Sequence, residues 1–178
     1  YSDAGATAND NYDGNITSNI VTVNGVDEDT VGSYTVTYNV TDANSNAATQ
    51  VSRTVNVVDT TAPVITLLGD ATVTIEVGST YSDAGATAND NYDGNITSSI
   101  VVTGTVDSDK VGSYTVTYSA TDDAGNTGTA TRTVTIEDTT APIITVLTGT
   151  DTVEVGGEWT DAGATANDNY DGNITSSI

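Results

Sequence analysis

The chain repeats itself with a period of about eighty residues. Residues 1–18, YSDAGATANDNYDGNITS, are identical to residues 81–98, and DAGATANDNYDGNITS recurs at 161–176. VGSYTVTY begins at residues 31 and 111, and DTTAP begins at residues 59 and 138. Self-similarity at such a period identifies the repeat as the structural unit, so the number of domains follows from the period rather than from the chain length.

Three units are predicted when each is taken to begin at DTTAP. Residues 59–137 form a complete repeat, residues 1–58 a repeat lacking its N-terminal part, and residues 138–178 a repeat lacking its C-terminal part. Both breaks fall at the same motif, so we expect a window of a longer array. An assembly in which terminal units complete one another is the alternative. Simple head-to-tail joining is disfavoured, because residues 159–178 and 1–20 encode the same element.

The pattern within a unit predicts β-structure throughout. Apolar and polar residues alternate along 114–121, which is typical of a half-buried antiparallel strand. The same alternation occurs at 71–77, 99–106 and 129–137. Clusters of Gly, Asn and Asp at 85–95, 104–112 and 122–128 predict turns between the strands. Short strands at this spacing indicate a small β-sandwich.

The motif string carries a family resemblance over the whole chain. APVITLLGD, EVGSTYSDAGATANDNYDGNITSSIVVTGTVD and VGSYTVTYSATDDAGNTGTATRTVTIED, in that order, resemble the bacterial immunoglobulin-like repeats of surface adhesins, secreted enzymes and pesticidal crystal proteins. The closing hairpin is similar to that of PKD-type and hyalin-type repeats. The resemblance implies an all-β fold of tandem immunoglobulin-like antiparallel β-sandwich repeats of about 79 residues. It also implies an extracellular, secreted or cell-surface location and a spacer role.

The charge of the chain excludes several partners. Only three residues are Lys or Arg against 25 Asp or Glu, for a formal net charge of −22. Nucleic acids and anionic membrane surfaces need a basic footprint, so neither is expected as a partner. No apolar run reaches the roughly 18 residues that would span a bilayer, so direct membrane insertion is not expected either.

Residue types that are missing restrict the chemistry further. The chain has no Cys, His, Met or Phe. Disulfides, thiolate or imidazole metal sites and histidine acid–base catalysis are therefore excluded. Any metal must be bound by oxygen, which favours Ca²⁺ first and Mg²⁺ second.

The acidic loop DNYDGNIT occurs at 10–17, 90–97 and 168–175. Residues 89–96 match the first half of the calcium loop D-x-[DN]-x-[DN]-G, with oxygen-bearing side chains at positions one, three and five and Gly at six. The second half fails, because position twelve is Ile100 and β-patterns replace the flanking helices. A calcium loop within a sandwich is therefore predicted, and an EF-hand is not. The alternative is that these acids only form turns on a solvated surface.

The remaining ligands are expected from the topology, since the closing hairpin turn and the DTTAP linker should meet the acidic loop at one end of the sandwich. Carboxylates gathered there would repel one another unless their pKa values rise or a divalent cation binds. We expect the cation. The predicted ligands are Asp10, Asp13 and Asp42 in the first unit; Asp59, Asp90, Asp93, Asn95, Asp122 and Asp123 in the second; and Asp138, Asp168 and Asp171 in the third.

Other polar and aromatic residues have structural interpretations. Tyr34 and Tyr114 open their strands in the manner of a tyrosine corner. Three further tyrosines, Tyr12, Tyr92 and Tyr170, are expected to fold back over their own acidic loops. The acceptor pattern N-x-[ST] makes four asparagines possible glycosylation sites, although those in the loops are also possible metal ligands; they are Asn15, Asn39, Asn95 and Asn173.

The function predicted from these features is structural. We expect a calcium-rigidified stalk of a surface adhesin, or the body of an extracellular filament, whose partners are neighbouring repeats of the same array. One alternative is a glycan-binding module, which would show aromatic residues lining a groove away from the metal site. Another is a self-assembling fibre formed by strand exchange. Enzymatic activity is not expected, because Asp90 and Asp93, although able to mimic a glycosidase pair, have no histidine or basic support.

Overall fold

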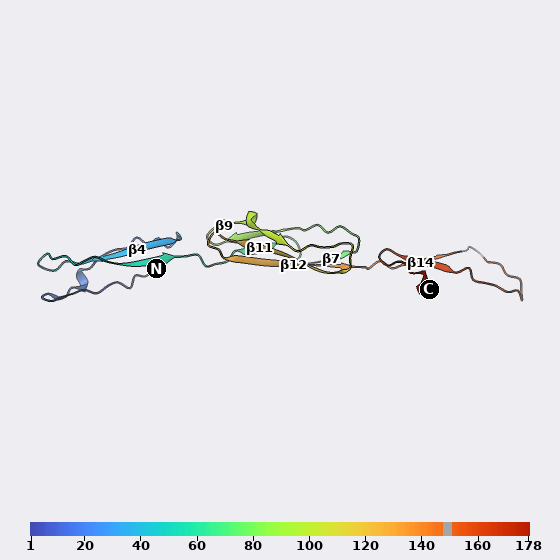
Figure 1. The fold of residues 1–178 in the computed structure, drawn as a ribbon, viewed down its shortest axis with the longest axis horizontal. Coiled ribbons are helices and arrows are strands. Elements are labelled where there is room, and N and C mark those ends of the chain that lie inside the picture. Colours follow the sequence, from blue (N-terminus) through green and yellow to red (C-terminus); the bar gives the residue numbers. More distant parts are fainter. Residues whose placement is uncertain (148–150) are drawn as a thin grey trace. The chain divides into compact units, whose positions relative to one another are not determined.

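A computed structural model describes residues 1–147 and 151–178, and most of its regular structure is short β-strands (Figure 1). The chain divides into two compact units, residues 1–61 and 62–178. The unit boundaries at 58/59 and 137/138 stay predictions from the repeat. Over the described part of the chain, no helix has the length and apolar character needed to cross a bilayer.

The complete repeat forms two β-sheets. One sheet has the strand order β10 (Val101–Thr103), β11 (Gly112–Thr121), β12 (Thr127–Glu137) and β7 (Thr72–Glu76). The other has the order β6 (Val64–Leu67), β8 (Ala86–Asp90) and β9 (Gly94–Asn95). Neighbouring strands are antiparallel except β7 and β12, which are parallel.

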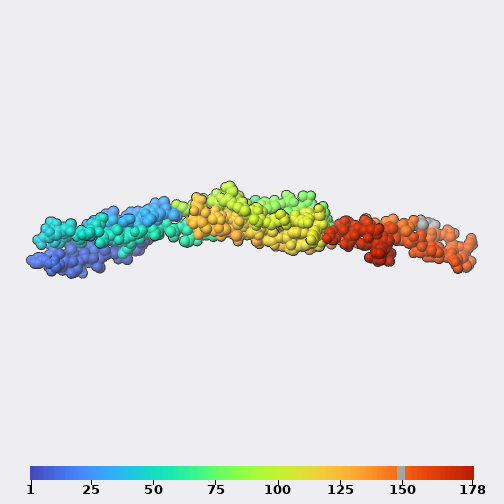
Figure 2. Space-filling model, viewed as in Figure 1, coloured from blue at the N-terminus to red at the C-terminus, as the bar shows by residue number. Residues whose placement is uncertain are grey.

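The core lies between these two sheets. Val116, Tyr118, Val134 and Ile136 are buried on the inner face of the β11–β12 hairpin, and residues of the β6–β8 sheet pack against them. The space-filling view shows segments far apart in the sequence forming one continuous body in this repeat (Figure 2). The predicted immunoglobulin-like β-sandwich is confirmed.

The strands predicted by alternation are present. Residues 114–121 lie within β11, residues 129–137 within β12, and 71–77 contains β7, whereas β10 is shorter than the predicted 99–106. The prediction that 85–95 is only a turn region is wrong, because β8 and β9 lie there. The inward residues of β8 are Ala88 and Asp90, one small and one charged, so the apolar alternation of this strand is weak.

The first unit contains the same closing hairpin. Its strands are β1 (Asn9–Asp10), β2 (Gly14–Asn15), β3 (Val21–Val23), β4 (Gly32–Asn39) and β5 (Val51–Val57), with β3, β4 and β5 in one sheet. A short 3₁₀ turn, η1 (Thr17–Asn19), follows the acidic loop. The inward residues Val36 and Tyr38 of β4 are buried, as their counterparts are in β11.

The last repeat contains the sheet that carries its acidic loop. Its strands β13 (Ile143–Val146), β14 (Ala164–Asp168) and β15 (Gly172–Asn173) pair in the order of β6, β8 and β9. The register is also the same, since Ile143 pairs with Asn167 as Val64 pairs with Asn89. The 3₁₀ turns η2 (Thr97–Ser99) and η3 (Thr175–Ser177) complete the equivalence.

Arg132 is the largest of the fully buried side chains, with 1% of its surface exposed. It forms an ion pair with Asp83 and donates to the Tyr118 hydroxyl oxygen at 2.9 Å and to the Asp70 carbonyl at 2.9 Å. Tyr118 in turn donates to the Asp83 carboxylate. Burial, followed by this hydrogen bond, raises the pKa of Tyr118 to about 12. Arg132, the only basic residue on the core face of β12, is thus held by an ion pair and by hydrogen bonds.

The tyrosine corners are confirmed. The Tyr34 hydroxyl donates to the Thr30 carbonyl at 2.8 Å, and the Tyr114 hydroxyl donates to the Lys110 carbonyl at 2.9 Å. Each bond ties the start of the closing hairpin to the loop before it.

Candidate metal centres

The acidic loop has the same local geometry in all three units. In the second repeat, Asp90 Oδ1 accepts backbone hydrogen bonds from Tyr92 at 2.8 Å and Asp93 at 3.0 Å. Asp10 and Asp168 accept the equivalent pairs of bonds. Gly94 follows at φ +72°, a left-handed conformation in which a side chain would be strained. The loop sequence is therefore constrained by its backbone as well as by any ligand.

The turn of the closing hairpin is built around a second aspartate. Asp122 accepts hydrogen bonds from the Asn126 backbone at 2.7 Å and from the Asn126 side-chain amide at 2.8 Å. Asp42 and Asn46 form the same pair of bonds in the first unit. These bonds hold the carboxylate of each turn in a fixed orientation.

A third aspartate joins the acidic loop to the hairpin turn. Asp93 Oδ2 accepts the backbone hydrogen bond of Asp123 at 2.8 Å. In the first unit, Asp13 Oδ2 accepts that of Ala43 at 2.9 Å. The predicted meeting of loop and turn at one end of the sandwich is thereby confirmed.

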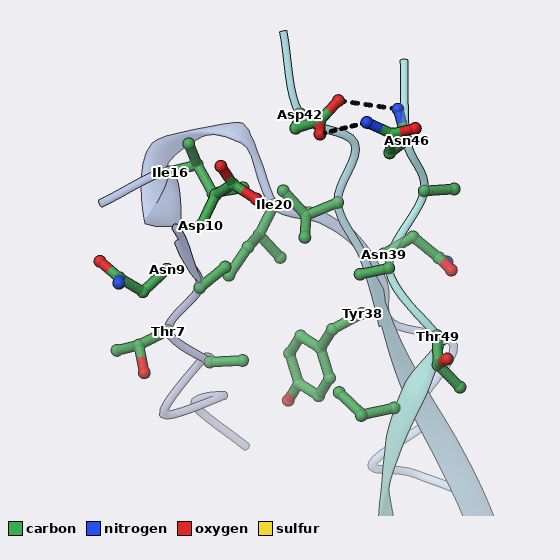
Figure 3. Close-up of a pocket in the computed structure, with 16 residues that line it drawn as sticks. Thr7, Asn9, Asp10, Ile16, Ile20, Tyr38, Asn39, Asp42, Asn46 and Thr49 are labelled. Atoms are coloured by element: carbon green, nitrogen blue, oxygen red, sulfur yellow. Dashed lines mark hydrogen bonds between the residues drawn. The ribbon is translucent and has the colours of Figure 1, made fainter. Parts of the chain in front are cut away.

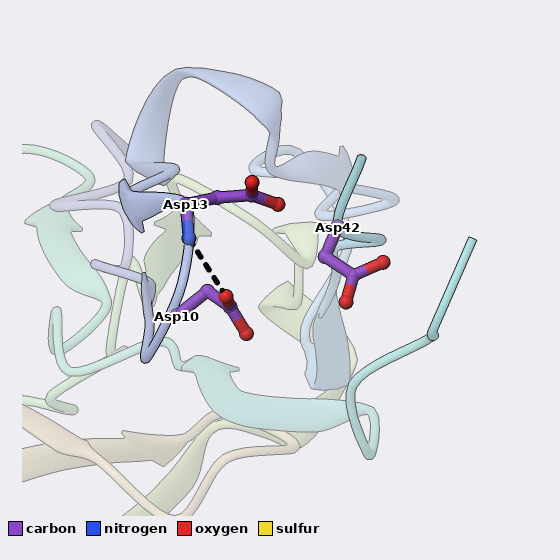
Figure 4. A group of neighbouring side chains, drawn as sticks. All are labelled: Asp10, Asp13 and Asp42. Carbon is purple, nitrogen blue, oxygen red and sulfur yellow. Dashed lines mark hydrogen bonds between the residues drawn. The ribbon is translucent and has the colours of Figure 1, made fainter. Parts of the chain in front are cut away.

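Two of the predicted ligand sets form close carboxylate clusters. One carboxylate oxygen from each of Asp10, Asp13 and Asp42 lies within 4.8 Å of the others (Figure 4). The same holds for Asp138, Asp168 and Asp171. Asp138 belongs to the DTTAP linker, so in the last repeat the linker and the acidic loop meet as predicted. Three carboxylates at such distances repel one another strongly unless a cation lies among them.

The second repeat shows the most buried acids. Asp90 is 3% exposed and Asp122 is 6% exposed. Within the described residues, Asp90 Oδ2 is buried and has no hydrogen-bond partner. A buried carboxylate oxygen without a partner is costly, and a bound cation or an ordered water would compensate for that cost.

All the predicted ligands of the second repeat, Asp90 and Asp122 included, stay predictions. Asp59 belongs to the first compact unit and Asp90 to the second. Asp93 and Asp123 take part in the bond between loop and turn. Asn95 Oδ1 accepts the Thr97 backbone hydrogen bond at 3.0 Å.

The carboxylates differ in how their pKa values are shifted. Backbone hydrogen bonds from Asp93 and Tyr92 lower the pKa of Asp90, and those from Asp13 and Tyr12 lower that of Asp10. Burial raises the pKa of Asp138, and the nearby carboxylates of Asp168, Glu76 and Asp171 raise it further. Asp90 and Asp10 are thus charged at neutral pH. Asp138 is repelled by the neighbouring carboxylates, and a bound cation would offset that repulsion.

The donor set fits a hard cation. All the clustered groups are carboxylates, and the surrounding loop supplies amide and backbone oxygens as further candidates. Oxygen ligands in an irregular arrangement suit Ca²⁺ better than Mg²⁺, which requires a near-ideal octahedron. Sites of this composition do not suit zinc or copper.

The tyrosines and asparagines of the acidic loops are exposed to different degrees. Tyr12 is 85% exposed, so the prediction that it folds back over its loop is wrong. Tyr92 and Tyr170 are 47% and 43% exposed. The loop asparagines are exposed, and each accepts a backbone hydrogen bond from the threonine two residues later; these are Asn15, Asn95 and Asn173. Glycosylation of these residues and of Asn39 stays a prediction.

A cavity of about 420 Å³ lies in the first unit (Figure 3). Residues 6–10 line one side and residues 46–49 another, and Tyr38 is the aromatic residue of the lining. Asp10 and Asp42 border it, so it adjoins the carboxylate cluster. It is not the aromatic groove away from the metal site that would favour a glycan-binding module. In the complete repeat, β6 occupies the corresponding place beside β8.

Comparisons with known proteins agree with the fold. Residues 1–57 and 65–136 match the sequence model of a family described as bacterial surface protein, immunoglobulin-like domain. An uncharacterised 81.3 kDa protein of Acholeplasma phage L2 is 36% identical over 179 residues, covering 95% of this chain and 24% of that protein. The chain thus spans about a quarter of the length of that relative.

Two solved structures are similar to part of this chain. The lipoprotein BT2262 of Bacteroides thetaiotaomicron has a TM-score of 0.40 and 33% identity, with 44% of this chain and 39% of that chain covered. The CBM51-2 and INT domains of Clostridium perfringens ZmpB, solved in complex with GlcNAc, have a TM-score of 0.36 and 27% identity, with 49% and 21% covered.

Proposed function

Because this chain belongs to the family of bacterial surface proteins with immunoglobulin-like domains, we propose that it is a calcium-stiffened segment of a surface stalk or filament. Membership of the family makes it a module of a surface protein, and such domains are typically non-catalytic. The relevant function is therefore mechanical: to hold other modules at a distance from the cell.

The observation that carries this proposal is the buried, unpartnered Asp90 Oδ2 at a pole where other carboxylates converge. Folding would not bury a lone carboxylate oxygen without compensation, since the desolvation cost is large. The same loop sequence and the same backbone hydrogen bonds recur in all three units, so each unit presents the same kind of acceptor oxygens. A bound Ca²⁺ would supply the compensation that Asp90 Oδ2 requires.

A cation at such a pole would also stiffen the array. Asp138 comes from the linker, whereas Asp168 and Asp171 come from the acidic loop of the last repeat. An ion shared among them would tie the linker to the loop. Extracellular calcium sites bind at roughly 10⁻⁴ to 10⁻³ M, so they fill only where calcium is plentiful.

Calorimetric titration tests the calcium site. We expect Ca²⁺ to give saturable heats with dissociation constants of roughly 10⁻⁴ to 10⁻³ M, and Mg²⁺ to bind more weakly. The Asp109→Asn variant serves as the control, because Asp109 is exposed and lies outside the clusters. Absence of saturable calcium binding by the wild-type chain would remove the basis of the proposal.

Strand exchange is a second candidate, favoured by the cavity in the first unit. It corresponds to the place of β6 in the complete repeat, and β13 carries nearly the same sequence with Ile143, Ile144 and Val146 largely exposed. If β13 leaves β14 of its own repeat and enters this cavity in a second copy, Ile144 faces inward as Ile65 does against its core, and Ile143 faces outward as Val64 does.

Sedimentation velocity in calcium-containing buffer tests strand exchange. Exchange predicts concentration-dependent polymers that Ile144→Arg abolishes, because a buried charge would replace an apolar contact. Ile143→Arg should leave the polymers intact. Monomers at every concentration, or equal effects of the two variants, would contradict strand exchange.

A further inference from the structure

Glu76 connects the complete repeat with the one after it. Glu76 is the last residue of β7. Its Oε2 accepts a hydrogen bond from the backbone N–H of Thr139 at 2.9 Å and another from the Thr139 hydroxyl. Its Oε1 accepts hydrogen bonds from the Thr140 hydroxyl at 2.7 Å and the Asn169 side-chain amide at 3.3 Å. One carboxylate thus contacts the linker and the acidic loop of the last repeat together.

These bonds involve an ionised acceptor. Hydrogen bonds from Thr139 and then from Thr140 lower the pKa of Glu76 to about 2, so the carboxylate is charged at neutral pH. Hydrogen bonds to a charged acceptor are stronger than neutral ones. The four donors occupy both oxygens, and the arrangement requires no metal ion.

We propose that Glu76 is a cation-independent latch that fixes the linker between the second and third repeats. By holding Thr139 and Thr140, it positions the preceding residue, Asp138, beside Asp168 and Asp171. The linker is then held in two separate ways, by the Glu76 latch and, when calcium is bound, by the carboxylate cluster. Only the effect on the cluster rests on the proposed calcium function.

The chain offers a matched control for this residue. Glu137 pairs with Glu76 in the parallel β12–β7 register, so the two residues lie at the same end of the same sheet on neighbouring strands. Its side chain is exposed, and among the hydrogen bonds of the described residues none is accepted by its carboxylate. Glu76→Gln and Glu137→Gln therefore remove the same charge from neighbouring positions, but only the first disturbs the linker.

Spin-label distance measurement tests the latch. The chain has no cysteine, so Thr131→Cys and Ser176→Cys, both at exposed positions, place one label in each repeat. In excess EDTA we expect Glu76→Gln to broaden the distance distribution about twofold or more, because the amide nitrogen of Gln cannot accept a hydrogen bond from Thr139. Glu137→Gln should keep the wild-type width.

A second variant guards against a general loss of structure. Thr140→Ala removes one donor to Glu76 from an exposed linker position, so it should broaden the distribution less than Glu76→Gln does. If Glu76→Gln unfolds the second repeat, the width of the distance distribution of Thr140→Ala tests the latch by itself. Distributions in which the variants at Glu76 and Thr140 are as narrow as that of Glu137→Gln would overturn the latch.

Calcium distinguishes the latch from the metal site. Under the full account, Glu76→Gln weakens calcium binding at Asp138, Asp168 and Asp171, and saturating calcium narrows its distance distribution again. If calcium changes neither the wild-type nor the variant distribution, the calcium function fails, while broadening in EDTA still supports the latch. If the wild type and Glu76→Gln have distance distributions of equal width in EDTA, and calcium narrows both, the latch is overturned and the calcium function is supported.

Discussion

Replacing Asp83 by asparagine should destabilise the complete repeat by about 3 kcal/mol or more, since it leaves the charge of Arg132 buried without a counterion. Arg132 has 1% of its side-chain surface exposed, so water cannot compensate for the lost carboxylate. The hydroxyl of Tyr118 would lose its charged acceptor in the same step. The cost arises from the stranded charge and not from the loss of packing.

The first unit provides the control for this prediction. Arg53 pairs with Asp3 as Arg132 pairs with Asp83, but the Arg53 side chain is 38% exposed. Asp3→Asn should therefore destabilise its unit much less, because solvent screens this pair. Urea unfolding followed through amide NMR signals of each unit separates the two effects. Adding Arg132→Met to Asp83→Asn should recover much of the lost stability, because it removes the buried charge. Equal losses of unfolding free energy for Asp83→Asn and Asp3→Asn would contradict the explanation by a buried charge.

Replacing Asp90 by asparagine should have opposite consequences with and without calcium. In EDTA the change should be neutral or stabilising, because it removes a buried charge whose Oδ2 has no partner among the residues described. Asn retains the Oδ1 acceptor, so the bonds from Tyr92 and Asp93 can persist. In calcium the variant should bind about tenfold more weakly or worse, a loss of about 1.4 kcal/mol or more.

Thermal unfolding and calcium titration of the same samples check this sign change. Asp109→Asn, which removes an equal charge outside the cluster, should behave as the wild type does in both buffers. An Asp90→Asn variant that loses stability equally in EDTA and in calcium would show that Asp90 only stabilises the turn. The site would then be a structural loop without a cation.

Much of the fold could be predicted from local patterns. The strands β11 and β12 alternate so regularly that their faces were evident from residues 114–121 and 129–137. The carboxylate clusters of the first and last units could be anticipated from the order of the motifs, because the acidic loop is repeated and should meet the hairpin turn in the first unit and the DTTAP linker in the last. These expectations needed only residue order and strand direction.

What sequence reasoning missed depends on contacts between distant segments. Glu76 meets Thr139, 63 positions later, because β7 pairs in parallel with β12, a pairing that alternation does not reveal. β8 is not evident from the sequence because its inward residues are a small alanine, Ala88, and a charged residue, Asp90, where large apolar side chains are expected. Arg132 did carry a signal, since it interrupts the apolar face of β12 between Ala130 and Val134, but its partner Asp83 is 49 residues away.

Thermal unfolding of the wild-type chain in excess EDTA and in about 1 mM calcium, at fixed ionic strength and with magnesium as the control, tests the calcium account most directly. With a dissociation constant of about 10⁻⁴ M, each filled site should add about 1.4 kcal/mol. That gain should raise the unfolding temperature of a repeat by roughly 5–10 °C. A rise specific to calcium is the predicted result. Superimposable curves in EDTA, magnesium and calcium would mean that the acidic loops are only turns.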